Sequence, residues 1–170
     1  VHIAVRAAVA ANVNMTFKLL YNGAVAMTGG QPVSGGETPW MISAQLAAEG
    51  VRDIAIVTDQ TDAFPADVNW AKNAKIYHRR ELIDVQNRLK TIRGVTALIY
   101  VQHCATELRR GRKRGTVAER PETVVINDAV CEGSGDCAEK STCVAVKPIW
   151  RPEGEKKQID HSLCKKDFSC

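Results

Sequence analysis

The apolar positions of the first hundred residues change repeatedly between strand spacing and helical spacing. Nearly continuous apolar runs predict buried strands, whereas apolar residues three and four positions apart predict helices with one buried face. The predicted strands cover residues 14–21, 53–59 and 95–102. The predicted helices cover residues 1–12, 40–50 and 80–94, the last two ending at glycines. This alternation predicts an α/β fold with an open, mostly parallel sheet.

Two of these helices have apolar residues on one side. In the helix over 40–50 they are Met41, Ile42, Leu46 and Ala47. In the helix over 80–94 they are Leu82, Val85, Leu89 and Ile92. Such spacing places side chains on one face of a helix, so we expect these residues to face the core. The strand over 95–102 is almost wholly apolar, which is typical of a strand covered on both faces.

A long segment rich in glycine, threonine and proline, residues 22–39, follows the first predicted strand directly. In open parallel sheets ligands bind beyond the carboxyl ends of the strands, so this segment lies where a binding loop is expected. Its Thr-Gly-Gly-Gln-Pro string, residues 28–32, has two interpretations. It is a surface turn, or Gly29 and Gly30 let backbone N–H groups approach an anionic ligand closely.

The composition changes after residue 105. The segment 107–115 holds five basic residues and one acidic residue, and a cysteine-rich tail follows it. We therefore predict two parts, residues 1–115 and residues 116–170. The net charge of the whole chain is only +4, which by itself indicates no charge-driven partner.

The basic segment 107–115 has two interpretations. Basic clusters bind nucleic acid, but this one has no interleaved aromatic residues for stacking on bases. A solvated connector, or a docking surface for an acidic partner, fits it better, so we predict no nucleic-acid partner. No apolar run approaches the roughly 20 residues that span a bilayer, so we also predict no membrane partner.

The chain starts at Val1 inside a helical pattern, and it lacks the charged and apolar regions of a secretory signal. We interpret it as a piece of a longer chain. The absence of a secretory signal argues against an oxidising compartment, so we expect a cytoplasmic location.

Five of the six cysteines lie in the last forty residues, with the spacings Cys131-x5-Cys137-x5-Cys143 and Cys164-x5-Cys170. This crowding favours a local metal or cluster site over a domain-wide disulfide framework. Three interpretations stay open: a [4Fe–4S] cluster, a zinc site built from thiolates, and disulfide bonds. Segment 131–137 has the frame of the cluster-binding C-x2-C-x2-C pattern, with Ser134 in the middle position.

Several strings together carry a family resemblance. They are AAVAANVNMTFKLLYNGAVAMTGGQPV, QLAAEGV, LIYVQHCATELRR and CEGSGDCAEKSTC. The first resembles the second half of the thiamine diphosphate-binding motif of the 2-oxoacid:ferredoxin oxidoreductases. In this order the four strings resemble the large fused indolepyruvate ferredoxin oxidoreductases within that family, and the likeness extends over essentially all 170 residues.

The resemblance implies an activity and a set of partners. The family oxidatively decarboxylates arylpyruvates to acyl-coenzyme A with thiamine diphosphate, and it passes electrons through iron–sulfur clusters to ferredoxin. The fold it implies is part of a thiamine diphosphate-binding domain followed by a ferredoxin-like cysteine segment. The expected partners are ferredoxin, coenzyme A, the arylpyruvate substrate, the rest of a longer chain and further copies of that chain.

The resemblance also implies cofactor residues. Mg²⁺, which holds the diphosphate, takes the side chain of Asn22 and the backbone carbonyl of Ala24, and oxygen ligands of this kind suit it. Four further residues close over the cofactor: Thr28, Gly29, Gly30 and Gln31. The family's Gly-Asp-Gly motif, which supplies another Mg²⁺ ligand, does not occur before Val1. We therefore expect these 170 residues alone not to bind thiamine diphosphate tightly.

The iron–sulfur candidates are Cys131, Cys137, Cys143, Cys164 and Cys170. Related sequences of the family have cysteine where this chain has Ser134, which puts assembly of the [4Fe–4S] cluster in doubt. No residue is identified as catalytic, and His2, His78 and His103 receive no role. A cysteine directly after a buried strand is usually a small apolar core residue, and we expect this of Cys104.

Overall fold

The computed structural model describes residues 2–25, 31–32 and 35–168 of the chain. The chain divides into two compact units, Val1–Glu107 and Leu108–Cys170. The division falls after Glu107, whereas the sequence placed it near residue 115. Among the described residues, no helix has both the length and the apolar character needed to cross a bilayer.

The first unit is built around a sheet of four strands. In chain order they are β1 (Met15–Tyr21), β4 (Asp53–Thr58), β5 (Ala74–His78) and β6 (Val95–Val101). Their order across the sheet is β1-β6-β4-β5, and every neighbouring pair is parallel. The predicted parallel α/β sheet is confirmed. The strand of this sheet that comes last in the sequence, β6, therefore lies in its interior, between β1 and β4.

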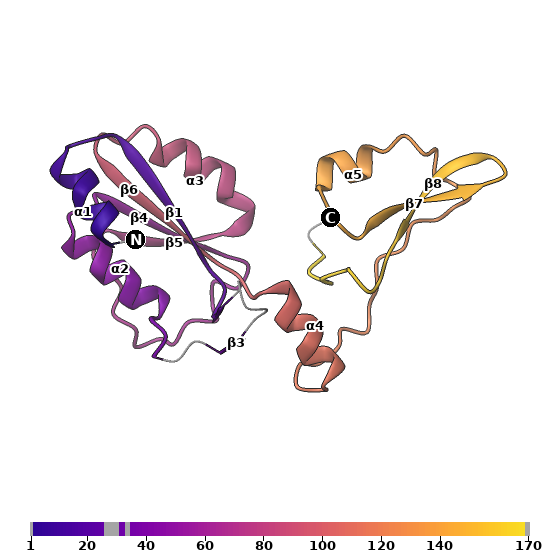
Figure 1. Ribbon diagram of the computed structural model, residues 1–170, viewed down its shortest axis with the longest axis horizontal. Helices are drawn as coiled ribbons and strands as arrows, with labels where there is room; N and C mark the ends of the chain where they lie inside the picture. Colours follow the sequence, from indigo (N-terminus) through magenta and orange to yellow (C-terminus); the bar gives the residue numbers. More distant parts are fainter. Residues whose placement is uncertain (1, 26–30, 33–34, 169–170) are drawn as a thin grey trace. The chain divides into compact units, whose positions relative to one another are not determined.

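Helices cover both faces of this sheet (Figure 1). Helices α1 (His2–Ala10) and α2 (Pro39–Ala48) lie on one face, and α3 (Leu82–Leu89) lies on the other. Val5 and Leu46 pack with Ile54 and Ile56 on the first face. On the other face, Val85 packs against the intervening strand residues. Successive side chains of a strand point to opposite faces, so the interior strands are buried on both sides, as the apolar run over 95–102 predicted.

The apolar face predicted for the helix over 40–50 was partly wrong. Leu46 is fully buried, but Met41 is 48% exposed. Ser43 is buried instead, because its hydroxyl donates to the carbonyl of Trp40 (2.7 Å) and accepts from the backbone N–H of Ala71 (3.3 Å). A buried hydroxyl with partners costs little, so this position tolerates a polar residue.

The helix over 80–94 is shorter than predicted. A 3₁₀ turn, Arg79–Glu81, leads into α3, which ends at Leu89. Gly94 therefore does not cap the helix. It has a φ of +98°, and a Cβ built on it would lie 2.6 Å from Nε of Arg52, so a glycine is required where the chain turns into β6.

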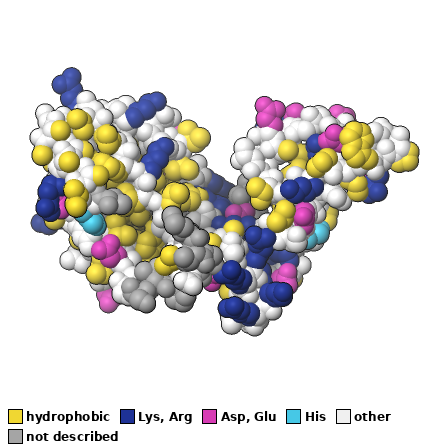
Figure 2. Space-filling view, viewed as in Figure 1, with side chains coloured by type: hydrophobic (Ala, Val, Ile, Leu, Met, Phe, Trp, Pro, Cys, Tyr) yellow, Lys and Arg dark blue, Asp and Glu magenta, His cyan; other side chains and the backbone are white. Residues whose placement is uncertain are grey.

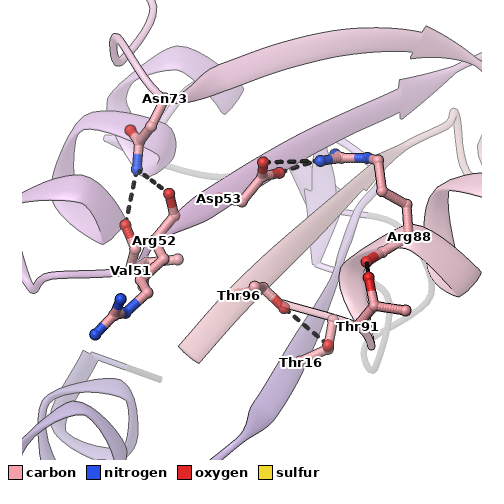
Figure 3. A network of polar contacts seen from close by, with 8 residues as sticks. All are labelled: Thr16, Val51, Arg52, Asp53, Asn73, Arg88, Thr91 and Thr96. Carbon is pink, nitrogen blue, oxygen red and sulfur yellow. Dashed lines mark hydrogen bonds and ion pairs between the residues drawn. The ribbon is translucent and has the colours of Figure 1, made fainter. Parts of the chain in front are cut away.

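The amino ends of the strands are joined by polar contacts (Figure 3). Both terminal nitrogens of Arg88 donate to the carboxylate of Asp53, at 2.8 and 2.9 Å. The side chain of Asn73 donates to the carbonyls of Val51 (2.7 Å) and Arg52 (3.3 Å). The hydroxyls of Thr16 and Thr96 are hydrogen bonded at 2.8 Å. The polar side chains at this edge of the sheet therefore bond to one another and to the backbone of the first unit.

Helix α4 (Ala105–Lys113) extends from the end of the first unit into the second. The basic segment predicted as a connector is thus largely helical, and Figure 2 shows Lys and Arg side chains gathered over it. The second unit also holds α5 (Asp136–Ser141) and an antiparallel hairpin of β7 (Val146–Arg151) and β8 (Gly154–Ile159).

Candidate functional site at the carboxyl edge of the sheet

The carboxyl ends of the strands surround a cavity of about 230 Å³. Three strand ends and the first turn of α2 line it, in contrast to the amino edge, where polar side chains bond to one another. The lining residues that the strands supply are Tyr21, Asn22, Thr58, Asp59, Val101, Gln102 and His103. The start of α2 supplies Thr38, Pro39 and Trp40. Open parallel sheets bind their ligands at this edge, because connections leave the strand ends in different directions there.

Asn22 lies at the end of β1, directly beside the cavity. Its side-chain oxygen accepts the backbone N–H of Ala24 at 3.0 Å, and this bond turns the chain immediately after the strand. Gly23, between them, has a φ of +66°, which glycine adopts without strain. An amide oxygen has two lone pairs, so Asn22 retains one acceptor position beyond this turn.

Helix α2 begins at the cavity with an ordered cap. The hydroxyl of Thr38 accepts the backbone N–H of Met41 at 3.4 Å, and Pro39 opens the first turn. The first turn of a helix carries partial positive charge, so this wall of the cavity favours an anion. This cap was not predicted from the sequence. The string Thr-Pro before an apolar run is the signal that predicts it.

Aromatic side chains form another wall. Trp40 and Phe64 line the cavity, and Trp70 contacts each of them edge to face, with ring centroids 6.2 and 5.1 Å apart. Beside them, the buried hydroxyl of Thr58 accepts the N–H of Gln60 at 3.2 Å. An aromatic wall excludes water and strengthens electrostatic interactions within the cavity.

The predicted cofactor residues have different outcomes. Thr28, Gly29 and Gly30 lie outside the described residues. Ala24 belongs to the short strand β2 (Ala24–Val25), which pairs antiparallel with β3 (Gln31–Pro32), so Gln31 is held across from β2. Of the whole predicted set, Asn22 is the residue that the structure places in the wall of the cavity.

The histidines differ in their surroundings. His103 lines the cavity, which the sequence did not indicate. His78 caps the 3₁₀ turn: its Nδ1 accepts the N–H of Arg80 at 3.3 Å, and its own N–H donates to Glu81. His2 lies on α1, away from the residues that line the cavity. His78 is therefore structural, and His103 joins Asn22 as a residue of the site.

Cys104 follows His103 at the start of α4 and is half-buried, not a core residue as expected. The pKa of its thiol lies below the ordinary value, chiefly because the backbone N–H of Glu107 donates to the sulfur. N–H groups at the start of a helix stabilise a thiolate in this way. Cys104 is not among the residues that line the cavity.

Several residues that line the cavity carry side-chain oxygen atoms. Asn22 contributes an amide oxygen, Thr58 a hydroxyl and Asp59 a carboxylate. Mg²⁺ prefers ligands of this kind, and an anion suits the start of α2. The donor set therefore fits a magnesium-bound diphosphate.

The described cysteines of the second unit do not form a ligand group. Among the described residues, no three Cys, His, Asp or Glu side chains form a group able to hold a metal ion. Cys131, Cys137 and Ser134 line one open hollow of about 350 Å³, and the sulfur of Cys131 accepts the N–H of Lys157 at 3.4 Å. The residues Cys104, Cys131, Cys137, Cys143 and Cys164 form no disulfides. Cys170 lies outside the described residues, and the cluster stays a prediction.

The loop that carries Cys131 is fixed by a close approach to the hairpin. Gly133 has a φ of +72°, and a Cβ built on it would lie 2.1 Å from the backbone oxygen of Glu155. The side chain of Lys156 donates to the carbonyl of Cys131 at 2.6 Å. Only glycine fits at position 133, so the loop and β8 form one structural element.

Comparisons with protein families, curated proteins and solved structures gave no match for this chain.

Proposed function

We propose that the Val1–Glu107 unit forms part of a magnesium–thiamine diphosphate site in an oxidoreductase acting on arylpyruvates such as indolepyruvate. The observation that carries this proposal is the position of Asn22. Its amide oxygen lies at the end of β1, beside a cavity at the edge of the sheet where ligands bind. The resemblance of the surrounding string to the 2-oxoacid:ferredoxin oxidoreductases supports the same residue.

The chain's own residues have distinct tasks in this proposal. Asn22 and the carbonyl of Ala24 supply oxygen ligands to Mg²⁺, and the turn between them sets their spacing. Trp40 and Phe64 exclude water from the cavity. Bound thiamine diphosphate supplies the electron sink for decarboxylation. After loss of CO₂ from the arylpyruvate, the acyl group would be transferred to coenzyme A and two electrons would pass to ferredoxin.

The Leu108–Cys170 unit is proposed as an iron–sulfur segment. Its composition supports this, since four described cysteines lie in a unit with almost no apolar core. Small units of this kind depend on metals or disulfides for stability. The described cysteines do not form a ligand group, so no electron-transfer step is assigned to particular residues.

The second candidate is a non-catalytic iron–sulfur or zinc-binding module. The concentration of cysteines in the second unit favours it. Anaerobic reconstitution with iron and sulfide, followed by metal analysis, separates the candidates when it is combined with an assay of indolepyruvate-dependent ferredoxin reduction. If the protein binds metal but does not reduce ferredoxin with indolepyruvate, the result supports the non-catalytic module.

The direct test measures magnesium-dependent thiamine diphosphate binding by calorimetry, with the protein expressed from its entire natural reading frame. Asn22→Ala is expected to weaken binding at least about tenfold, the equivalent of about 1.4 kcal/mol. Asn22→Asp keeps an oxygen ligand and is expected to retain binding. Asn87→Ala, an exposed position on α3, is the matched control. Equal affinity of Asn22→Ala and the control would contradict the proposal.

A further inference from the structure

The second unit contains a hollow with a different character from the one beside Cys131. It has a volume of about 260 Å³, and charged side chains dominate its lining. Arg109, Arg112 and Lys113 enter it from α4, and Glu119 and Lys166 enter it from the segments that follow. Four positive groups and one negative group therefore face a single small space.

The spacing of the helical residues brings the three cations together. Arg109 lies three residues before Arg112 and four before Lys113, and side chains at these separations share a helix face. Figure 2 shows dark blue side chains gathered over this helix. Two of these side chains, Arg109 and Arg112, also contact the segment around residues 162–165.

The closing segment is held by the same arginines. Nη2 of Arg112 donates to the carbonyl of Lys165 at 2.8 Å, and Nη1 of Arg109 donates to the carbonyl of Ser162 at 3.3 Å. Lys166 has a φ of +55° and turns its ammonium group to Glu119, 2.7 Å away. These contacts hold in place the segments and side chains that line the hollow.

The charges in the hollow are not balanced. The pKa of Glu119 lies below its ordinary value, first because Lys166 donates a hydrogen bond to it and also through the charges of Lys166 and Arg112. Glu119 therefore stays ionised and pairs with Lys166. Among the described residues, Arg109, Arg112 and Lys113 form no ion pair with a carboxylate in the hollow, although the charge of Arg112 also acts on Glu119.

Arg112 also has a donor without an acceptor. Its Nε is buried, and no hydrogen-bond partner for it lies within the described part of the chain. A guanidinium offers its N–H groups in a planar fork that matches two oxygens of a phosphate group. An anion in the hollow would supply an acceptor for this Nε, for which the described part of the chain provides none.

We propose that this hollow binds a phosphate or diphosphate group, with Arg112 as the central ligand and Arg109 and Lys113 as supporting cations. The volume suits a small anion better than a large organic ligand, because pockets for drug-sized ligands occupy about 300–1,000 Å³. The group belongs to a free inorganic anion or to a nucleotide that carries it.

The test titrates the protein with inorganic pyrophosphate by calorimetry in about 150 mM salt, where long-range attraction is screened. The parent protein is expected to bind saturably. Arg112→Ala is expected to weaken binding at least about tenfold, since it removes charge-assisted hydrogen bonds. Arg114→Ala is the matched control, because it removes one positive charge from the same basic segment without lining the hollow. Its expected effect is less than about twofold.

A second variant tests whether weaker binding could result from unfolding of the protein. Lys113→Ala removes a cation whose side chain holds no described segment in place, and it is expected to weaken binding about threefold to fivefold with an unchanged circular dichroism spectrum.

Titration with ADP separates the two sources of the phosphate. Tighter binding of ADP than of pyrophosphate assigns the site to a nucleotide, and equal or weaker binding assigns it to the inorganic anion. Absence of saturable binding, or equal losses for Arg112→Ala and Arg114→Ala, would overturn the proposal.

Discussion

The Val1–Glu107 unit and the Leu108–Cys170 unit are stabilised in opposite ways. The first buries apolar side chains on both faces of its sheet. In the second, Ala145 is the only buried apolar residue within the described part of the chain. The contacts of the second unit include a hairpin, a tight loop and ion pairs such as those of Arg151 with Asp128 and Lys166 with Glu119.

This difference has an energetic meaning. Burial of apolar surface contributes about 25 cal/mol per Å², whereas an exposed ion pair contributes about 0–1 kcal/mol. The first unit therefore has an internal source of stability. A group that binds only the folded state would raise the free energy of unfolding of the second unit. Both proposals for this unit, a metal and an anion, supply such a group.

The largest expected effect comes from the core of the first unit. Ile56→Ala removes a fully buried side chain and is expected to lower the free energy of unfolding by about 3–4 kcal/mol. Ile149→Ala, in half-buried surroundings on β7, is expected to cost about 1 kcal/mol. Urea unfolding measures both changes in the free energy of unfolding. The transitions are monitored by circular dichroism and by tryptophan fluorescence, which arises from Trp40 and Trp70 in the first unit and from Trp150 in the second. Equal losses would reveal a core in the second unit and contradict the comparison.

The second unit has its own sensitive position at Gly133. Gly133→Ala places a methyl group against the carbonyl of Glu155 and is expected to cost about 2–3 kcal/mol. Gly135→Ala has the same type of backbone conformation with open space around it, and about 1 kcal/mol is expected. Thermal unfolding monitored by Trp150 fluorescence measures the difference. Identical melting temperatures for the two variants would show that the loop does not contact β8.

Polar contacts in the first unit are expected to contribute less than its core. Arg88→Ala removes the two-point ion pair with Asp53 and the contact with the Tyr77 ring, 5.5 Å from the guanidinium carbon. The expected cost is about 1–1.5 kcal/mol, because Arg88 is partly exposed. Arg93→Ala, at an exposed position, is the control and is expected to be neutral. A loss as large as that of Ile56→Ala would mean that the amino edge, not the core, dominates stability.

The smallest expected effect is an acid transition in the second unit. The pKa of Asp160 lies below its ordinary value, chiefly because the hydroxyl of Ser162 donates to it. Its stabilising contribution is therefore present above the unfolded-state pKa of about 3.9 and is lost as the pH falls through the lower folded-state value. Trp150 fluorescence is expected to report loosening below about pH 4. Asp160→Asn is expected to reduce this pH dependence, and an unchanged profile would exclude Asp160 as its source.

The sequence predicted the parts of the fold that depend on burial. The apolar run over 95–102 and the spacing of Val85 and Leu89 were sufficient because they form the core. Strand β5 was missed, since Ala74–His78 carries a lysine, a tyrosine and a histidine on an edge with partial exposure. Helix α4 was missed for a related reason. Four of its nine residues are basic, and no side chain in it is buried.

The candidate site was predictable only in part. Asn22 was predicted because it belongs to the string that carries the family resemblance. Thr58, His103 and the aromatic wall come from separate segments that meet only after the sheet has formed, and no local pattern indicates that meeting. The spacing of the cysteines likewise predicts a shared ligand group, but spacing alone does not determine which sulfur atoms the backbone brings together.

The interior position of β6 has a consequence for the time course of folding. Thr96 and its neighbours pair with both β1 and β4, although β1 precedes them by 80 residues. Contacts between distant segments require a large loop to close first, which slows folding. During synthesis, β1 and β4 emerge before the strand that joins them. The sheet is therefore completed only once residues 95–101 are available, and until then the edges of β1 and β4 are open to incorrect pairing.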